Sequence, residues 1–319
     1  MLCYNITQIP PISGIIFGVQ ALNLPLSRAL AVLAITCLSA LGGAQAAPPK
    51  VVTTIAPLHS IASNVMQGLS SPKLLLKGNS SPHSYSMKPS EAKALAEADL
   101  ILWVGPSLES FLTKAINSLG KKAKVIELLK EEDLFLLDAR GSKKAPVPDP
   151  HLWLTTTNGE EIANILAAAL AKMDPTNADT YMKNARAFRN KMDKVRRRLE
   201  VLLRSYATVP FMTYHDGFQY FERGFSLASK GFVTAHPERP IGANRVALLK
   251  GTIMSQKIQC LFVEPQVQPK LAQTLTEGTK ARIATIDPLG AKIPLGVDMY
   301  GTLIKNLGQA FISCLSGKP

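Results

Sequence analysis

The sequence has little cysteine and few charged residues for its length. Four cysteines in 319 residues are too few to form the framework of a small disulfide-stapled protein. Charged residues make up 18% of the chain and apolar residues 46%, a composition that excludes a mainly disordered protein. A chain of this length and apolar content can form one large or two medium-sized domains around a buried core.

Acidic residues are scarce relative to basic ones. The chain has 23 Asp and Glu against 36 Lys and Arg, which gives a formal net charge of +13. Such an excess can reflect binding to nucleic acid or to an anionic membrane surface, or it can reflect no specific partner.

The N-terminal segment has no apolar run of the length that crosses a membrane. The uncharged run 29–41 (ALAVLAITCLSAL) has only 13 residues, follows Arg28 and precedes an A-x-A cleavage pattern at 44–46. We therefore predict a cleavable signal peptide over residues 1–46 and location in the periplasm, with a buried core helix as the alternative for the run. Cys37 lies in no convincing lipid-attachment context, so a lipoprotein is less favoured. Export excludes nucleic acid as a partner and leaves a weak contact with an anionic membrane surface open.

Export also leaves two cysteines, Cys260 and Cys314, in the mature chain. An even pair in an oxidising compartment favours a disulfide, which by loop-closure entropy would stabilise the fold by about 4 kcal/mol. The alternative is a pair of free, buried thiols.

Short β-rich runs alternate with helical patterns along the mature chain. We expect strands at 51–55, 74–76, 100–104, 123–126, 209–213, 259–263 and 282–286. We expect helices at 59–65, from the N-cap Ser90 through 98, and at 108–119, 217–221, 243–255, 270–276 and 298–314. This alternation is typical of α/β domains with parallel sheets and crossover helices. The Pro-containing segment 138–150 is expected to be a loop.

The clearest helix begins at Ala178. Its apolar residues recur at alternating spacings of three and four up to position 206, which keeps one face apolar throughout. The remaining faces are strongly basic, and we interpret them as solvated, with a membrane- or partner-binding face as the alternative. We expect an N-terminal α/β lobe (47–174), a connecting helix (175–206) and a C-terminal α/β lobe (207–319), each lobe with a mainly parallel sheet.

Three of the five histidines occupy comparable places in this pattern. His83 and His215 each follow an expected strand, and His151 ends the loop 138–150. Asp287 follows the strand 282–286 in the same way. Ligands bind at the carboxyl ends of strands in parallel α/β sheets, because the loops there converge on one crevice.

Three imidazoles and one carboxylate form a coherent ligand set for zinc. Calcium and magnesium favour oxygen ligands, and a second carboxylate in place of an imidazole shifts the preference toward manganese. The sequence contains no HExxH, and the wide spacing of these residues matches no short metal motif. From the residues alone, isolated surface or structural histidines therefore remain the alternative.

Six segments spread over the mature chain form a recognisable set: 82–90 (PHSYSMKPS), 103–106 (WVGP), 151–154 (HLWL), 215–218 (HDGF), 263–266 (VEPQ) and 287–290 (DPLG). In content and order they resemble the motifs of periplasmic zinc-binding proteins that serve bacterial zinc ABC importers. These belong to the metal-specific cluster of solute-binding proteins. The resemblance implies two α/β lobes, a rigid connecting helix and one metal ion in the cleft between the lobes.

The resemblance also carries over individual residues. It implies that His83, His151 and His215 are metal ligands, and it matches Cys260 and Cys314 to the family's disulfide pair. The fourth ligand is expected to be Asp287, with water or Glu264 as alternatives. The implied function is capture of Zn(II) and its delivery to the membrane permease of an ABC importer, without catalysis. We expect a monomer.

The chain departs from the family's pattern at two places. The loop before His151 is short, basic and free of histidine, where many zinc-binding members have a long acidic, His-rich loop. Pro82 occupies a position where some members have Glu. Manganese-binding relatives generally have Glu where this chain has His215, so the resemblance favours zinc. His59 and His236 match no ligand motif.

Two alternative functions remain. One is a manganese- or iron-binding protein, or an adhesin, with the same fold. The other is a zinc-dependent hydrolase with a water-occupied fourth position and Asp216 or Glu264 as the general base.

Overall fold

Two parallel sheets form the framework of the computed structural model, which describes residues 47–317 except 78–79, 141–145, 238 and 268. The predicted signal peptide lies outside the described residues. The first sheet has the order β2-β1-β3-β4 and contains β1 (Val51–Thr53), β2 (Lys73–Leu74), β3 (Leu100–Trp103) and β4 (Lys124–Glu127). The second has the order β6-β5-β7-β8 and contains β5 (Phe211–His215), β6 (Ser229–Thr234), β7 (Cys260–Val263) and β8 (Arg282–Thr285). Every pair of neighbouring strands in both sheets is parallel.

Short helices connect the strands of the first sheet. They are α2 (Ala56–Val65), α3 (Pro89–Ala96) and α4 (Thr113–Leu119), with 3₁₀ turns at Ser110–Leu112 and Leu128–Lys130. The expected N-cap of α3, Ser90, is wrong by two positions. The N-cap is Lys88, whose backbone N–H donates to Glu91 at 2.7 Å. Pro89 takes the first helical position because its missing N–H and fixed φ cost nothing there.

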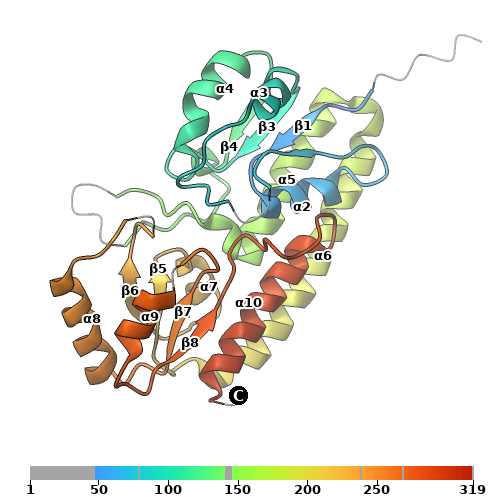
Figure 1. Ribbon diagram of the computed structural model, residues 1–319. Helices are drawn as coiled ribbons and strands as arrows, with labels where there is room; N and C mark the ends of the chain where they lie inside the picture. The colour runs from blue at the N-terminus through green and yellow to red at the C-terminus, as the bar shows by residue number, and fades with distance from the viewer. Residues whose placement is uncertain (1–46, 78–79, 141–145, 238, 268, 318–319) are drawn as a thin grey trace, which may run out of the picture. The chain divides into compact units, whose positions relative to one another are not determined.

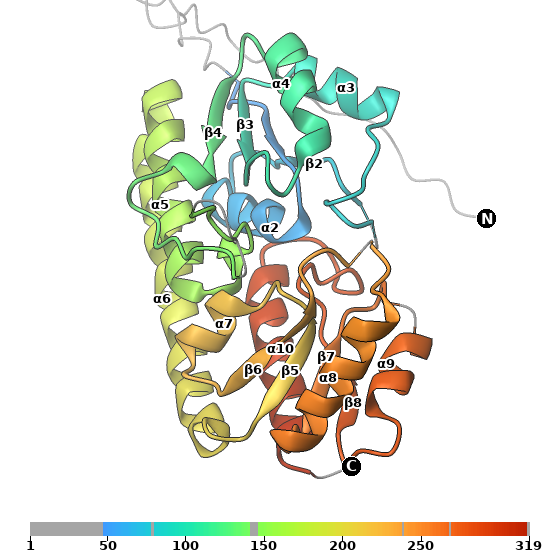
Figure 2. The same ribbon diagram turned by 90° about the vertical axis from the view of Figure 1, so that its left-hand side faces the viewer.

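The second sheet is connected by α7 (Gln219–Gly224), α8 (Ala243–Ser255) and α9 (Pro269–Thr276). A short 3₁₀ helix, Leu152–Leu154, follows His151. Figure 2 shows α8 and α9 lying near the strands of this sheet, with α7 close to the segment that carries the 3₁₀ helix. The bounds of α8 agree with the expected helix at 243–255.

Three longer helices complete the described part of the chain. They are α5 (Thr156–Met173), α6 (Ala178–Leu203) and α10 (Met299–Leu315), with 3₁₀ turns at Pro175–Asn177 and Arg204–Tyr206. At 1.5 Å per residue, the 26 residues of α6 extend about 39 Å. Figures 1 and 2 both show α6 running alongside α5 and α10, which it contacts.

The apolar stripe of α6 faces the protein core. Its buried residues are Tyr181, Ala185, Phe188, Met192, Leu199 and Leu203. Full burial of a Phe or Met side chain contributes about 1.5–3 kcal/mol, so this stripe attaches α6 firmly along its length. The prediction of the stripe fails only near its end, where Leu203 is buried and Leu202 is 43% exposed.

A disulfide joins Cys260, at the start of β7, to Cys314, near the end of α10. The two Cα atoms lie 6.1 Å apart, within the usual range for a bridge. The predicted pairing of these cysteines is confirmed.

The expected fold class is confirmed, because both halves of the chain contain parallel sheets with flanking helices. Two elements were not expected: α5 and β6. The lobe boundaries at 174 and 206 stay a prediction. Among the described residues, no helix is both long enough and apolar enough to span a bilayer.

Candidate metal centre

A small cleft of about 220 Å³ lies where loops from both sheets meet. Its lining includes Leu108 from after β3, Glu264 from after β7 and Pro288 from after β8. His83, His151 and His215 also line it. This volume is below the range of pockets for drug-sized ligands, so the cleft suits a small solute.

The structure brings the three predicted histidines together. The ring centroids of His151 and His215 are 4.8 Å apart, and the ring of His83 lies 5.5 Å from the first and 5.3 Å from the second. Each imidazole offers one nitrogen to a group whose members all lie within 4.8 Å of one another. Imidazole ligands 2.0–2.1 Å from one zinc ion are about 3.3 Å apart, so a small closing movement suffices to complete a site.

His151 is held by a carboxylate two residues before it. Asp149 Oδ1 accepts hydrogen bonds from the backbone N–H of His151 at 3.0 Å and lies 2.7 Å from His151 Nδ1. Burial would raise the pKa of Asp149, but the adjacent His151 outweighs it and the pKa is lowered. The other ring nitrogen of His151, Nε2, is buried and has no hydrogen-bond partner in the described structure. A buried nitrogen without a partner is the atom expected to bind a ligand in the cleft.

His215 is the last residue of β5 and is almost fully buried. Glu264 Oε2 lies 3.1 Å from its Nδ1, an ion-pair distance outside hydrogen-bond geometry. Burial alone would lower the pKa of His215, but the carboxylates of Glu264, Asp216 and Asp149 raise it. A Cβ at Gly217 would lie 3.0 Å from His215 Nδ1 and 3.2 Å from His151 Nε2. A larger residue at position 217 would therefore displace one or both of these imidazole rings.

His83 comes from a different kind of element. It lies between β2 and α3 in a segment without regular helix or strand, and its side chain is half-buried. Burial, followed by the positive charges that His151 and His215 could carry, lowers the pKa of His83 to about 2. The imidazole is therefore neutral near pH 7, the form that binds a metal.

Asp287 is not part of this group, and its role as the fourth ligand stays a prediction. Its Oδ1 accepts hydrogen bonds from the backbone N–H groups of Leu289 at 3.0 Å and Gly290 at 2.9 Å. Its Oδ2 accepts another from Ala291 at 2.7 Å. Both carboxylate oxygens thus stabilise the turn that follows β8.

The remaining two histidines also lie outside the group. His59 Nε2 is 3.2 Å from the carbonyl oxygen of Pro72, and burial lowers the pKa of His59. His236 is exposed after β6.

Sequence reasoning missed the residues that support His151. Gln219 Nε2 donates to Asp149 Oδ2 at 3.1 Å, and Tyr220 Oη donates to the carbonyl of Asp149 at 2.9 Å. The Asp-Pro-His spacing at 149–151 was an available signal, because a carboxylate two residues before a histidine can reach its Nδ1. No local sequence pattern predicted that Gln219 and Tyr220 of α7 would bond to Asp149.

Two parallel α/β lobes with a small cleft between their loops are the architecture of a two-lobed solute-binding protein. The family described as "Zinc-uptake complex component A periplasmic" matches residues 51–314. The chain belongs to this family.

Individual proteins show the same relationship. The chain is 39% identical to the "High-affinity zinc uptake system protein ZnuA" of Brucella suis biovar 1 over 327 residues, covering 90% of this chain and 97% of that protein. A solved structure described as "Crystal structure of ZnuA" superimposes with a TM-score of 0.73 at 22% identity, covering 84% of this chain and 99% of the other. A Mn-bound periplasmic metal-binding protein from Candidatus Liberibacter asiaticus gives a TM-score of 0.72 at 23% identity, with coverage of 83% and 99%. The two structural similarities show the fold alone.

Proposed function

We propose that this protein captures one Zn(II) ion in the periplasm and delivers it to the permease of an ABC importer. The observation that carries the proposal is the group of three imidazoles in the cleft. Membership in the zinc-uptake family and the zinc-uptake name of the Brucella relative support the metal and the transport role.

The chemistry of the donor set favours zinc over harder metals. His83, His151 and His215 supply imidazole nitrogen donors, whereas manganese sites generally contain more oxygen. Because the fold also occurs in a Mn-bound protein, the fold alone does not select the metal, and the choice rests on these donors and on the family membership.

A water molecule completes the coordination in our proposal. Asp287 accepts three backbone hydrogen bonds that it would have to give up to reach a metal. Glu264 lies against His215 Nδ1, where it can orient the ring. Among the candidates considered from the sequence, water is the one that requires no rearrangement of the described structure.

We propose a binding protein rather than a hydrolase. The two carboxylates that could act as general bases are both engaged: Asp216 pairs with Arg140, and Glu264 pairs with His215. An esterase and phosphatase screen of the zinc-loaded protein tests this. Turnover that is lost on removal of zinc would establish the hydrolase instead.

Release of the metal involves local loop movement in this proposal. The helix α6 packs against both α5 and α10, which opposes wide bending between the two halves. Export through the N-terminal signal, the monomeric state, the lobe boundaries at 174 and 206 and a weak contact of the basic surface with anionic lipid stay predictions.

A metal titration tests the proposed function. Metal-free protein is titrated with zinc and, separately, with manganese and iron(II) in competition with a chelator of known affinity. We expect one tightly bound zinc per chain and weaker binding of the other metals. Absence of zinc binding, or a clear preference for manganese or iron, would overturn the proposal.

A substitution at His215 sharpens the same test. His215→Glu adds a hard oxygen donor at a buried ligand position, so the zinc-over-manganese preference should fall. Unchanged selectivity would remove His215 from the ligand set.

A further inference from the structure

Two short antiparallel stretches of chain precede His151, which lines the cleft. We call residues 137–140 together with 146–149 the strap. The backbone N–H of Ala139 donates to Val147 O, and that of Asp149 donates to Leu137 O, each at 2.7 Å. The strap therefore places Asp149 at its base, two residues before His151.

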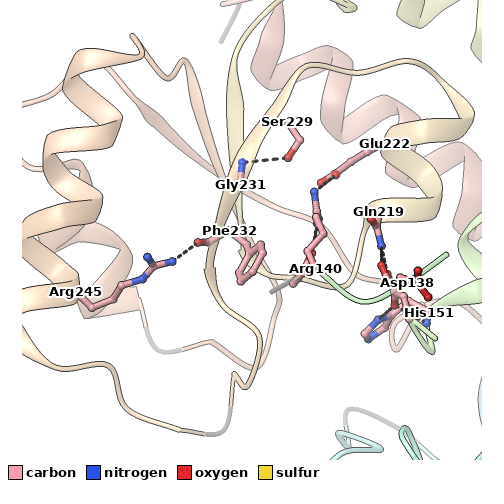
Figure 3. A network of polar contacts seen from close by, with 11 residues as sticks. Asp138, Arg140, His151, Gln219, Glu222, Ser229, Gly231, Phe232 and Arg245 are labelled. Carbon is pink, nitrogen blue, oxygen red and sulfur yellow. Dashed lines mark hydrogen bonds and ion pairs between the residues drawn. The ribbon is translucent and has the colours of Figure 1, made fainter. Parts of the chain in front are cut away.

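The strap is attached to α7, an element of the second half of the chain. Gln219 Nε2 donates to Asp138 O at 2.9 Å and to Asp149 Oδ2 at 3.1 Å. Tyr220 Oη accepts a hydrogen bond from Leu137 N at 3.0 Å and donates to Asp149 O at 2.9 Å. Figure 3 shows Gln219 beside Asp138 and His151.

Arg140 makes the charged part of this attachment. Its Nε donates to Asp216 Oδ1 at 2.7 Å, and its Nη1 donates to Glu222 Oε2 at 2.8 Å. Its guanidinium also lies 5.5 Å from the ring centroid of Phe232. The side chains of Asp216 and Glu222 are each only 6% exposed, so their charges depend on this partner.

Each end of this network lies next to a histidine of the candidate metal centre, by contact at Asp149 and by chain adjacency at Asp216. Asp216 directly follows His215 in the chain, and Asp149 contacts His151 Nδ1 at 2.7 Å. Arg140 thus links the segment that orients His151 to the residue next to His215. The 3₁₀ helix that follows His151 makes a further contact: Trp153 Nε1 donates to Pro288 O at 2.8 Å.

We propose that Arg140 is a positioning residue that fastens the strap to Asp216 and Glu222, so that His151 and His215 form a preformed pair before the metal arrives. His83, carried by a segment without regular structure, then completes the site. A preformed pair raises affinity because less ordering has to occur on binding. This inference rests on the proposed function, in which these histidines bind zinc.

The test compares Arg140→Ala and Arg140→Lys with a matched control, Arg245→Ala. Arg245 extends from α8 and donates from Nη2 to Phe232 O at 3.1 Å, on the same strand that Arg140 contacts. Figure 3 shows Arg245 and Arg140 reaching Phe232 from different sides. The control removes an exposed arginine that contacts the same strand without touching the strap.

Two quantities are measured: zinc affinity by chelator competition, and hydrogen exchange of the Ala139 and Asp149 amides in metal-free protein. We expect Arg140→Ala to weaken zinc binding by about 10- to 100-fold and to accelerate exchange at both amides. Arg140→Lys should recover part of each effect, and Arg245→Ala should match the wild type. Wild-type affinity in Arg140→Ala, or an equal loss in Arg245→Ala, would overturn the inference.

A double variant separates positioning from stability. Arg140→Ala leaves two buried carboxylates without their partner, and Glu222→Gln neutralises one of them, so Arg140→Ala/Glu222→Gln should recover part of the lost thermal stability. Zinc affinity should remain low, because the strap is still unfastened. Recovery of affinity together with stability would show that Arg140 acts only through the fold.

The two proposals can fail separately. If the wild type binds no zinc, the proposed function fails. If it binds zinc and Arg140→Ala binds it equally well, only the role of Arg140 fails. The amide exchange readout needs no metal and tests the strap in either case.

Discussion

In two of the three histidines that line the cleft, a carboxylate lies next to the ring nitrogen Nδ1. Asp149 lies 2.7 Å from Nδ1 of His151, and Glu264 lies 3.1 Å from Nδ1 of His215. A carboxylate at one ring nitrogen fixes the ring orientation and leaves the other nitrogen for a metal. The site therefore depends on acidic residues that need not touch the ion.

This arrangement predicts a contrast between two aspartates. Asp149→Asn weakens the contact with His151 Nδ1 and should reduce zinc affinity by about 10- to 100-fold. Asp287→Asn should leave zinc affinity within about twofold, since Asp287 bonds to backbone N–H groups of its own turn. Chelator competition measures both. A loss in Asp287→Asn as large as that in Asp149→Asn would make Asp287 a ligand.

Another buried carboxyl, that of Glu109, follows β3 and immediately precedes the 3₁₀ turn Ser110–Leu112. Glu109 accepts hydrogen bonds from the Thr54 hydroxyl and, at 3.0 Å each, from the backbone N–H groups of Val104 and Gly105. Burial raises its pKa from 4.5 to about 7. The folded state thus binds a proton more tightly than the unfolded state, so the stability from Glu109 is full below about pH 4.5 and is lost as the pH rises through 7.

Glu109→Gln should remove this pH dependence. The amide stays neutral, so the variant should equal the wild type near pH 4.5 and exceed it by about 3 kcal/mol at pH 8. Urea denaturation of metal-free protein at both pH values measures the difference. Parallel stability curves for the two proteins would contradict the raised pKa.

The candidate ligands could be found from the sequence because each follows a strand or ends a loop. That pattern and the family resemblance were enough to predict His83, His151 and His215 as ligands. The role of Asp287 could not be read in this way, because its position after β8 suits a turn-stabilising carboxylate as well as a ligand. The role of Arg140 could not be predicted from the sequence either, because its partners, Asp216 and Glu222, are more than 70 residues away in the chain.

At the scale of elements, glycines decide how closely the long helices approach. A Cβ at Gly308 of α10 would lie 2.4 Å from Leu199 Cδ2 of α6. A Cβ at Gly159 of α5 would lie 2.3 Å from the hydroxyl oxygen of Tyr300 of α10. That hydroxyl donates toward the carbonyls of Trp153 and Thr155, at 2.8 and 2.9 Å.

Gly159→Ala should therefore destabilise the protein by about 1–3 kcal/mol, the usual cost of overpacking, despite the better helix propensity of alanine. Gly251→Ala is the matched control, because Gly251 lies inside α8 and a Cβ there meets nothing within 4 Å. That variant should gain up to about 1 kcal/mol. Thermal denaturation compares them, and equal melting temperatures would contradict the close approach of α5 and α10.

The predicted elements differed from the structure where local signals were weak. Helix α8 was expected with its actual bounds, whereas α5 was missed although Ile162, Leu166 and Leu170 recur at a spacing of four. Strand β6 lies at the edge of its sheet and contains Lys230 and Gly231, which are poor strand formers. Its pairing with β5 therefore comes from the tertiary structure.

At the scale of the whole molecule, one covalent link ties the second sheet to the last helix. The bridge between Cys260 and Cys314 spans 54 positions of sequence. Replacing both cysteines by alanine should lower the free energy of unfolding by about 4 kcal/mol, by the loop-entropy relation. Zinc affinity should not change, because neither cysteine belongs to the histidine group. Urea denaturation and chelator competition measure the two effects, and a large loss of affinity would contradict their independence.

The net charge of +13 describes the surface rather than the cleft. Basic residues such as Lys183, Arg186 and Lys194 are exposed along α6, while the imidazoles lie between the loops of the two sheets. An overall positive field does not attract a cation, so capture must depend on the few donors in the cleft.

The most direct test of the account is X-ray absorption at the zinc edge, on protein loaded with one equivalent of zinc. The account predicts three imidazole nitrogens at about 2.0–2.1 Å and one oxygen donor. A shell of mainly oxygen atoms, a sulfur ligand, or zinc lost on gel filtration would contradict it.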